Sequence, residues 1–524
     1  MALEWVHNLK EIEFRPPSKE MAAVALNEGL DYRVKSGKRI FRLTNPYQAA
    51  LFRQPTDRLP DWLLDEVEAL QQQVAYSASI GPRRDHSGIW PSNCEPMPFQ
   101  IAGLEYALDR RHTIFGDPPG LGKTVQAIIT CNALQAEKVV VVCPAAVRQQ
   151  WGREIAKWST RKSNTIHVVK GMKTGINPFA NWIVVSYPLS AKEPVNAALH
   201  AYKPDIIIYD ESHFLKSEDS QRTRAAFGPV VSRSPVYGLV HTGARILALT
   251  GTLLPNRPRE CHVLVRSLDH EAIDYMGYES FADYYNPEQR LAGREITGHL
   301  RELNARLRSS LMVRRPKNRV LTQLPELMIE IVYAEEDASV RKALQAEKLV
   351  DFDEALGTVV SHGADGAIAT ARRLMGEALC PFALDYVQTL LDGEVKKLFV
   401  GVYHKSVMAE FKKKFPKAVC IDGSTTNKDA KLREFIDSPE IQLLVGQIIS
   451  VGTGVDGLQK VCDRCLVVEP DWTPGGNQQF MDRLHRHGQQ RGVLAQFLVA
   501  EGSISEKIMQ RVAQKARIAG EVLD

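Results

Sequence analysis

The stretch at residues 116–124, with the sequence GDPPGLGKT, constrains the fold of this 524-residue chain more than any other. An apolar segment precedes it, and a helical pattern at 125–134 follows it. A strand, a Gly-rich loop and a helix in this order form a phosphate-binding loop. The stretch therefore predicts a nucleotide site at the end of a strand, although a Gly-rich helix start without a ligand would have a similar local sequence.

Each part of this loop has an expected task. Gly120 and Gly122 allow backbone N–H groups to turn toward phosphate oxygens, and the following helix points its N-terminus at the same anion. Lys123 is placed to reach the β- and γ-phosphates, and Thr124 to hold Mg²⁺. Asp117 stands where the pattern G-x-x-x-x-G-K-[ST] has its first glycine, and we expect it to contact the nucleotide with the rest of the loop.

Length and composition are those of a globular protein with several domains, because 524 residues are too many for one core. No apolar run is long enough to span a bilayer, and the N-terminus lacks the pattern of a secretory signal. Eight scattered cysteines fit a reducing compartment, so we expect a cytoplasmic protein. A formal net charge of +4 neither requires nor excludes nucleic acid as a partner.

Periodicity and composition divide the chain into five parts. We expect an N-terminal accessory domain at 1–76, a linker at 77–95, a first α/β domain at 96–265, a helical insertion or bridge at 266–375 and a second α/β domain at 376–524. The close pair Cys462 and Cys465 opens an apolar run in the last part, which favours a strand entrance over a metal site.

The accessory domain contains a candidate DNA contact. Residues 32–43 alternate apolar and basic side chains on both sides of a Ser-Gly turn, which predicts a hairpin. Five basic residues lie on it or beside it: Arg33, Lys35, Lys38, Arg39 and Arg42. They form either a solvated strand face or a surface that contacts DNA phosphates.

Four short apolar runs follow the phosphate loop, at 139–143, 183–187, 205–209 and 246–250, and helical stretches separate them. Continuous apolar strands separated by helices indicate a parallel sheet that is covered on both faces. In such sheets ligands bind at the carboxyl ends of the strands. The runs therefore place their C-terminal residues near the predicted nucleotide.

Two adjacent carboxylates, Asp210 and Glu211, end the third run within the sequence DESH. Such a pair is unfavourable at a strand end unless a cation or a water molecule uses it. Asp210 is suited to hold Mg²⁺, and Glu211 to orient and deprotonate the attacking water.

A second alternating α/β region begins near residue 396, with predicted strands at 398–402, 419–422, 443–446 and 466–469. It has no second Gly-Lys-Thr, so we expect it to assist catalysis rather than to hydrolyse its own nucleotide. Near its end Arg483 and Arg486 lie three residues apart, which predicts that they share one helix face. Paired guanidinium groups suit a transferring phosphoryl group, although a solvated basic helix face has the same pattern.

Together these motifs resemble the Swi/Snf-related ATPases of helicase superfamily 2, over about residues 96–520. The resemblance rests on their order: Gln100, DPPGLGKT, DESH, LTGT, an Arg-Arg-x-Lys segment at 314–317, and the sequence QFMDRLHRHGQ at 479–489. The sequences RRLMGEA at 372–378 and YHKSV at 403–407 look closest to the annealing-helicase, fork-remodelling branch, and the compact build is typical of a bacterial or phage member. Leu253 departs from the family, which usually has proline after Thr-Gly-Thr.

The resemblance implies two RecA-like doubly wound parallel-sheet lobes with ATP and Mg²⁺ between them and duplex DNA across both. It implies that Gln100 and Gln479 contact the nucleotide, and that Arg483 and Arg486 complete the site from the second lobe. We therefore expect an ATP-dependent translocase on double-stranded or branched DNA that remodels forks or junctions. We favour a monomer, with replication or recombination proteins as candidate partners. Two alternatives are the motor subunit of a restriction or anti-phage system, and a nucleotide-switched DNA clamp with little turnover.

Overall fold

The computed structural model describes residues 13–14, 18–27, 30, 32–35, 38–43, 45–52, 61–161, 164–228, 238–251, 253, 258–285, 290–291, 294–295, 299–348, 366–393, 395–451, 456–471, 474–503, 505–506 and 509. Along the sequence, the chain divides into two compact units between Val320 and Leu321. We refer to them as unit 1 and unit 2, and each is described by itself. Among the described residues, no helix is both long enough and apolar enough to cross a membrane.

A seven-stranded parallel sheet forms the centre of unit 1, with the order β12-β4-β9-β8-β5-β7-β6. Its strands are β4 (Thr113–Phe115), β5 (Val139–Cys143), β6 (Ile166–Val168), β7 (Trp182–Ser186), β8 (Ile206–Asp210), β9 (Arg245–Leu249) and β12 (Met312–Val313). The four apolar runs of the sequence are thus parallel strands, as their pattern predicts.

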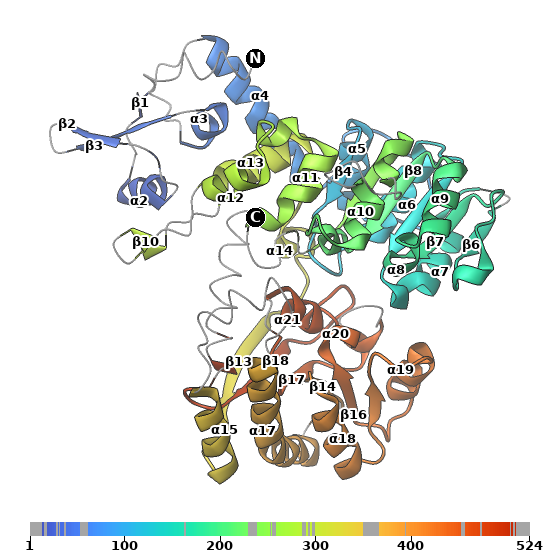
Figure 1. Ribbon diagram of the computed structural model, residues 1–524, viewed down its shortest axis with the longest axis vertical. Helices are drawn as coiled ribbons and strands as arrows, with labels where there is room; N and C mark the ends of the chain where they lie inside the picture. The colour runs from blue at the N-terminus through green and yellow to red at the C-terminus, as the bar shows by residue number, and fades with distance from the viewer. Residues whose placement is uncertain are drawn as a thin grey trace. The chain divides into compact units, whose positions relative to one another are not determined.

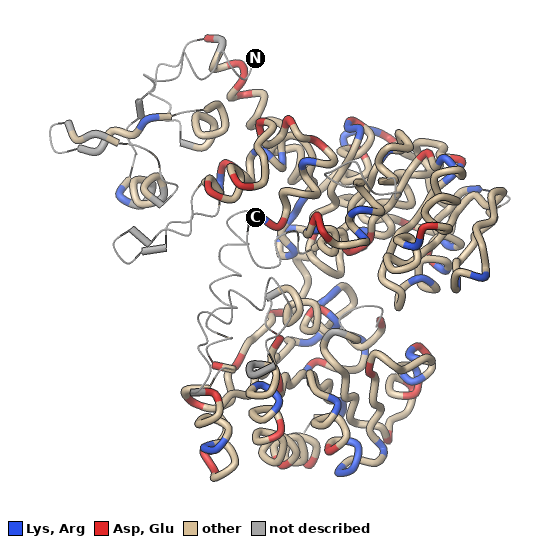
Figure 2. The backbone as a smooth tube through the Cα atoms, viewed as in Figure 1, with Lys and Arg blue, Asp and Glu red and all other residues tan. Residues whose placement is uncertain are grey.

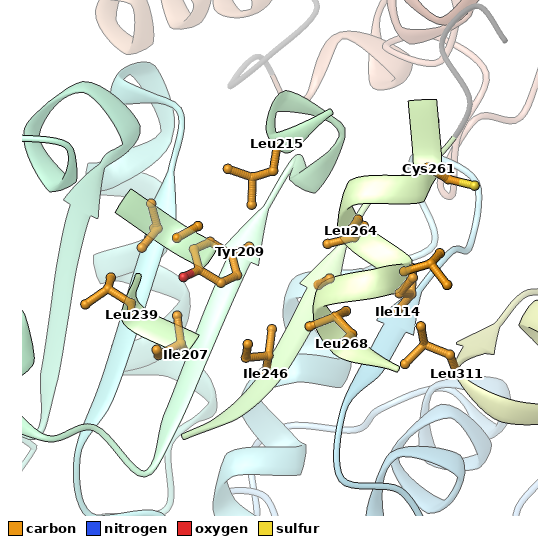
Figure 3. Close-up of a cluster of buried hydrophobic side chains, with 14 of the residues drawn as sticks. Ile114, Ile207, Tyr209, Leu215, Leu239, Ile246, Cys261, Leu264, Leu268 and Leu311 are labelled. Atoms are coloured by element: carbon orange, nitrogen blue, oxygen red, sulfur yellow. The ribbon is translucent and has the colours of Figure 1, made fainter. Parts of the chain in front are cut away.

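Helices cover both faces of this sheet. One face packs against α5 (Pro98–Leu108), α6 (Lys123–Ala133) and α7 (Arg148–Trp158). The other face packs against α9 (Glu193–Tyr202), α10 (Gln221–Phe227), α11 (His262–Leu268), α12 (Tyr278–Tyr285) and α13 (Leu300–Ser310). Figure 3 shows part of this second layer, where Leu264 and Leu268 lie beside Ile114 and Ile246 of the sheet. Burial on both faces explains why the strands are uniformly apolar.

The N-terminal segment has a small core of its own. The predicted hairpin is confirmed, because β2 (Tyr32–Lys35) pairs antiparallel with β3 (Lys38–Arg42), and β1 (Glu13–Phe14) adds a third strand. The helices α2 (Lys19–Asn27), α3 (Pro46–Phe52) and α4 (Asp61–Ser77) pack with it. On α3, Gln48 Nε2 donates to Glu302 Oε2 of α13 at 3.1 Å, so this segment is part of unit 1.

Unit 2 contains a six-stranded parallel sheet with the order β13-β18-β17-β14-β16-β15. Its strands are β13 (Leu327–Tyr333), β14 (Leu398–Val402), β15 (Val419–Ile421), β16 (Leu443–Gln447), β17 (Arg464–Val467) and β18 (Val493–Val499). Its helices are α15 (Ala338–Lys348), α17 (Gly366–Asp392), α18 (Lys405–Lys414), α19 (Lys428–Asp437), α20 (Ile448–Val451) and α21 (Pro474–Met481). The two parallel α/β sheets of the chain (Figure 1) agree with the expected fold class.

The structure differs from the expected helical insertion at 266–375. Within these residues, β12 joins the sheet of unit 1, whereas β13 joins the sheet of unit 2 as an edge strand. The sequence does not predict β13, because four successive side chains, Met328 to Ile331, are exposed and do not form a buried apolar run. The strand β18 was also missed, although its side chains are mostly buried.

Charged residues of both signs are interspersed along the described backbone of each unit (Figure 2). A basic cluster stands out at the end of α18, whose last turn carries Lys412, Lys413 and Lys414. The small net charge of the chain therefore reflects a near balance of 66 basic and 62 acidic residues rather than a scarcity of charge.

Candidate nucleotide site

The loop at 116–122 connects the end of β4 with the start of α6, as its sequence predicts. Gly120 and Gly122 have φ angles of +88° and +70°, in the left-handed region that favours glycine. A Cβ atom at position 122 would collide with the side-chain amide of Gln100. The loop therefore needs glycine here, and α6 begins directly after it at Lys123, so the N-terminus of the helix adjoins the loop.

Lys123 and Thr124 occupy the first turn of α6. The Lys123 ammonium group folds back into the loop, where it donates to the backbone oxygen of Asp117 at 2.8 Å and to that of Pro118 at 3.4 Å. Burial lowers the pKa of Lys123, while the nearby carboxylates of Glu211, Asp117 and Asp210 oppose this shift. The structure thus brings the loop lysine into the field of the acidic pair.

Asp210 is the last residue of β8, and its carboxylate is held in place by two hydrogen bonds. Trp151 Nε1 donates to its Oδ2 at 2.8 Å, and the backbone N–H of Glu211 donates to its Oδ1 at 3.1 Å. Burial, together with the negative charge of Glu211, raises the pKa of Asp210 to about 6. A cation beside this carboxylate would favour its ionised form, so the group fits an Mg²⁺ ligand.

Glu211 has a φ angle of +52°, which is unfavourable for a residue with a side chain. Its Oε2 lies 3.3 Å from Nδ1 of His213, and that ring nitrogen lies 3.2 Å from the hydroxyl of the buried Thr250. His213 therefore links the acidic pair to the end of β9. Strained backbone of this kind is concentrated at functional sites, where the surrounding structure maintains it.

Asp117 has a structural environment that its position in the loop pattern did not suggest. Its carboxylate is fully buried and forms an ion pair with Arg315, whose Nε donates to Oδ1 at 3.0 Å. Gln126 Nε2 donates to the other carboxylate oxygen at 2.9 Å. Because both oxygens are used in this way, Asp117 anchors the loop in this structure, and the expected direct contact with a nucleotide does not fit its burial.

The neighbouring Arg314 fixes two further backbone segments at this edge. Its Nη1 donates to the backbone oxygen of Gly116 at 2.6 Å and lies 3.5 Å from that of Gly251. Both arginines belong to the motifs that carry the resemblance, but the sequence does not indicate these contacts or the roles of Gln126 and Trp151. The one available signal was the carboxylate of Asp117 at a glycine position, since a buried charge requires a partner.

Gln100 lies in the first turn of α5 and is buried. Its Oε1 accepts a hydrogen bond from the Met97 N–H at 2.9 Å, and its Nε2 donates to the backbone oxygen of Leu121 at 3.2 Å. The residue is therefore bonded to the phosphate loop itself. Its expected contact with an adenine base stays a prediction.

The other expected nucleotide contacts belong to unit 2. Gln479 is half-buried on α21. Arg483 and Arg486 do not share a helix face, because α21 ends at Met481 and the chain continues in tight turns. The Arg486 Nη1 atom forms an ion pair with Asp456 Oδ1 at 3.2 Å. The prediction of a common helix face is thus wrong, although both guanidinium groups lie on one short segment.

For four of the five basic hairpin residues, namely Arg33, Lys35, Lys38 and Arg39, the side chains lie outside the part of the chain that the structure describes. Arg42 is exposed, and its backbone pairs with that of Glu13. In the hairpin, Lys35 pairs with Lys38, which agrees with the expected position of the turn. A contact between this hairpin and DNA stays a prediction.

Comparison with known proteins shows which family this chain resembles. The model of the SNF2-related domain matches residues 62–362. The chain is 28% identical over 441 residues to the SWI/SNF-related matrix-associated actin-dependent regulator of chromatin subfamily A-like protein 1 of Xenopus tropicalis, which covers 81% of this chain and 44% of that protein. It is 28% identical over 458 residues to the DNA annealing helicase and endonuclease ZRANB3 of Bos taurus, which covers 82% of this chain and 40% of that protein.

The chain thus spans less than half the length of these two relatives. Among solved structures, the Sulfolobus solfataricus SWI2/SNF2 ATPase core in complex with dsDNA aligns with 82% of this chain and 94% of its own, at 18% identity and a TM-score of 0.39. Since the family model matches more than half of the 524 residues, the chain belongs to the SNF2-related family.

Proposed function

We propose that the chain is an ATP-dependent DNA translocase, which hydrolyses ATP to ADP and phosphate while it moves on double-stranded or branched DNA and remodels forks or junctions. One observation carries the proposal. The phosphate loop with Lys123 and the acidic pair of Asp210 and Glu211 meet at the carboxyl edge of a single parallel sheet. Burial lowers the pKa of Lys123, and the charges of both carboxylates oppose this shift.

In this proposal the N–H groups around Gly120 and Gly122 bind the phosphates, and Lys123 neutralises the charge of the β- and γ-phosphates. Thr124 and Asp210 would hold Mg²⁺, which would supply further positive charge beside the phosphate oxygens. Glu211 orients a water molecule and accepts its proton. His213 lies close enough to Glu211 to position that carboxylate, and Asp117 keeps the loop in shape through Arg315.

Unit 2 is proposed to supply Gln479, Arg483 and Arg486 to the same reaction. Guanidinium groups stabilise the charge of a transferring phosphoryl group and contribute about 10³–10⁵-fold to turnover in related chemistry. DNA as the partner is supported by the names of the relatives, one of which is called a DNA annealing helicase.

The test is steady-state ATP hydrolysis with and without duplex DNA. Lys123→Ala should abolish hydrolysis, because it removes the cation beside the phosphates. Glu211→Gln should retain ATP binding and lose turnover, since the amide keeps the shape but cannot accept the proton. Glu193→Gln is the matched control, because Glu193 is exposed at the start of α9 in the same unit.

Two outcomes would contradict the proposal. Turnover of Glu211→Gln at the rate of the Glu193→Gln control would remove Glu211 from the reaction. Wild-type hydrolysis that is negligible at every DNA concentration, with tight DNA binding in the presence of ATP, would identify a nucleotide-switched clamp instead.

A further inference from the structure

A pocket of about 420 Å³ lies at the carboxyl edge of the sheet in unit 1, and its lining includes none of the residues assigned above to the nucleotide. Pro144 and Ala145, which follow β5, form one wall. Tyr187 and Pro188 of α8 (Tyr187–Ser190) and Phe214 of the 3₁₀-helix η3 (Ser212–Leu215) form others. The start of α10, at 220–222, forms a polar rim.

Two aromatic residues of this lining connect the pocket to the acidic pair. The Phe214 ring lies 4.7 Å, between ring centroids, from His213, which contacts Glu211. Tyr187 packs edge-on against Phe214 at 5.8 Å, and its hydroxyl donates to the backbone oxygen of Asp210 at 2.8 Å. A molecule that contacts either ring therefore acts on a residue that itself contacts Asp210 or Glu211.

The chemistry of the lining indicates the kind of ligand. Proline and aromatic side chains offer flat apolar surfaces, on which a planar ring stacks favourably. The amide of Gln221 can donate and accept hydrogen bonds at the edge of such a ring. The Arg222 guanidinium group lies over the Phe214 ring, 5.3 Å from its centroid, and the lining contains no carboxylate. A planar, uncharged ring joined to a phosphodiester matches these groups.

We propose that this pocket receives one unpaired nucleobase of the DNA, and that its occupancy positions His213 and Glu211 for hydrolysis. The inference rests on the proposed function and adds to it a preference for DNA with unpaired nucleotides. Extruding a base from an intact duplex costs a few kcal/mol, whereas an unpaired base costs least. The pocket therefore selects branched or bulged DNA over smooth duplex.

The experiment compares three DNA molecules that differ at one position: a smooth duplex, the same duplex with one bulged adenosine, and the same bulge with an abasic nucleotide. The abasic bulge keeps the backbone and its flexibility but removes the base. The DNA concentration for half-maximal ATPase stimulation is measured for each. We expect the wild-type protein to require about tenfold less of the bulged adenosine DNA than of the abasic DNA, since stacking on an aromatic side chain contributes about 1–3 kcal/mol.

A matched pair of variants tests the location. Ala145 and Ala146 are adjacent and both exposed on the 3₁₀-helix η1 (Ala145–Val147), but only Ala145 lines the pocket. Ala145→Trp should fill the pocket and remove the preference for the base, whereas Ala146→Trp should retain it. Arg222→Ala should weaken binding of both bulged molecules, unlike Arg224→Ala two residues further along α10, where Arg224 pairs with Asp219. Thermal melting of each variant checks that the fold is intact.

A direct signal comes from 2-aminopurine at the bulged position, whose fluorescence should change with the wild-type protein and with Ala146→Trp but not with Ala145→Trp. Equal half-maximal concentrations for the adenosine and abasic bulges would overturn the inference, and so would a preference that survives in Ala145→Trp. Loss of ATP hydrolysis in Ala145→Trp without DNA would also overturn the inference. The open pocket would then be needed for hydrolysis itself and not for binding a base. If duplex stimulates hydrolysis in all these cases, the proposed translocase stands; if no DNA stimulates it, the translocase itself fails.

Discussion

At the scale of single residues, the acidic pair is held in states that an unconstrained chain would avoid. Asp210 is next to a like charge with a raised pKa, and Glu211 has a positive φ angle. Both features lower stability, and both place carboxylate oxygens at the edge of the sheet. Such local costs are typical of sites where function, rather than packing, selects the conformation.

The backbone cost at Glu211 can be measured with two variants that both lose the carboxylate. Glu211→Gly should have a free energy of unfolding about 1 kcal/mol higher than Glu211→Ala, because only glycine tolerates the left-handed conformation without a Cβ penalty. Urea denaturation followed by tryptophan fluorescence measures this, since Trp151 and Trp182 are buried in unit 1. Equal stabilities of the two variants would mean that position 211 is not strained.

The buried ion pair of Asp117 and Arg315 should affect the free energy of unfolding. Burial raises the pKa of Asp117, but the charge and hydrogen bonds of Arg315 hold it below the usual value. Arg315→Met leaves this carboxylate buried without its main partner, which should lower the free energy of unfolding by about 3–5 kcal/mol at neutral pH. The double variant Asp117→Asn/Arg315→Met should recover part of the loss.

The sign of the pH dependence follows from the same pair. In Arg315→Met the pKa of Asp117 should rise above its unfolded value, so the folded state binds more protons than the unfolded state. The stability of this variant relative to the double variant should then increase as the pH falls through the raised pKa. Denaturation of both variants at several pH values checks this, and a constant difference between them would contradict it.

At the scale of elements, the segment after α21 shows how a helical pattern can end early. The Gln489 side chain donates to the backbone oxygens of Cys462 at 2.9 Å and Leu484 at 3.3 Å, and its Oε1 accepts from the N–H groups of Gln490 and Arg491. These bonds stabilise turns in place of a further helical turn. The arginines are therefore positioned by a bonded loop rather than by helix periodicity.

The predicted contact between DNA and the hairpin of β2 and β3 can be tested by removing the charges of the hairpin. If its five basic residues contact DNA phosphates, neutralising them should weaken binding and reduce the slope of log K against log salt concentration by about one for each lost contact. The control replaces Arg33, Arg39 and Arg42 with lysine, which keeps the charge and should keep the slope. Binding titrations at several salt concentrations measure both, and an unchanged slope in the neutralised variant would leave the hairpin as a solvated face.

At the scale of the whole molecule, the candidate catalytic groups are divided between two compact units, with Lys123 and Glu211 in unit 1 and Arg486 in unit 2. Each unit has its own parallel sheet and its own buried core. If the proposed reaction uses groups of both units, its rate depends on what brings the two units together. DNA bound to both would favour the assembled form through its differential affinity for that form.

We therefore expect slow ATP hydrolysis without DNA and strong stimulation with duplex DNA. Arg486→Ala should lose the stimulated rate and still bind ATP and DNA. Its ion pair with Asp456 is partly exposed, so its removal should change stability little. Arg491→Ala is the matched control, because Arg491 pairs with Asp463 at 3.0 Å on the same segment. Wild-type hydrolysis that is equally fast without DNA, or strong stimulation of Arg486→Ala, would contradict a divided site.

The sequence alone was enough to predict the fold class, four strands of the first sheet and the family. Continuous apolar runs revealed the strands β5, β7, β8 and β9, because burial on both faces leaves an unbroken local pattern. The glycines of the phosphate loop and the carboxylates after β8 were equally local signals. The resemblance to Swi/Snf-related ATPases, which rests on such motifs, is confirmed by the family match.

Contacts between residues that are distant in sequence are visible only in the folded structure. Asp117 and Arg315 are 198 residues apart, and no local pattern pairs them. The strand β13 was assigned to a helical stretch because its exposed edge lacks an apolar pattern, and its pairing with β18 spans more than 150 residues. A local pattern records which side chains are buried, whereas these contacts depend on which segments meet when the sheets assemble.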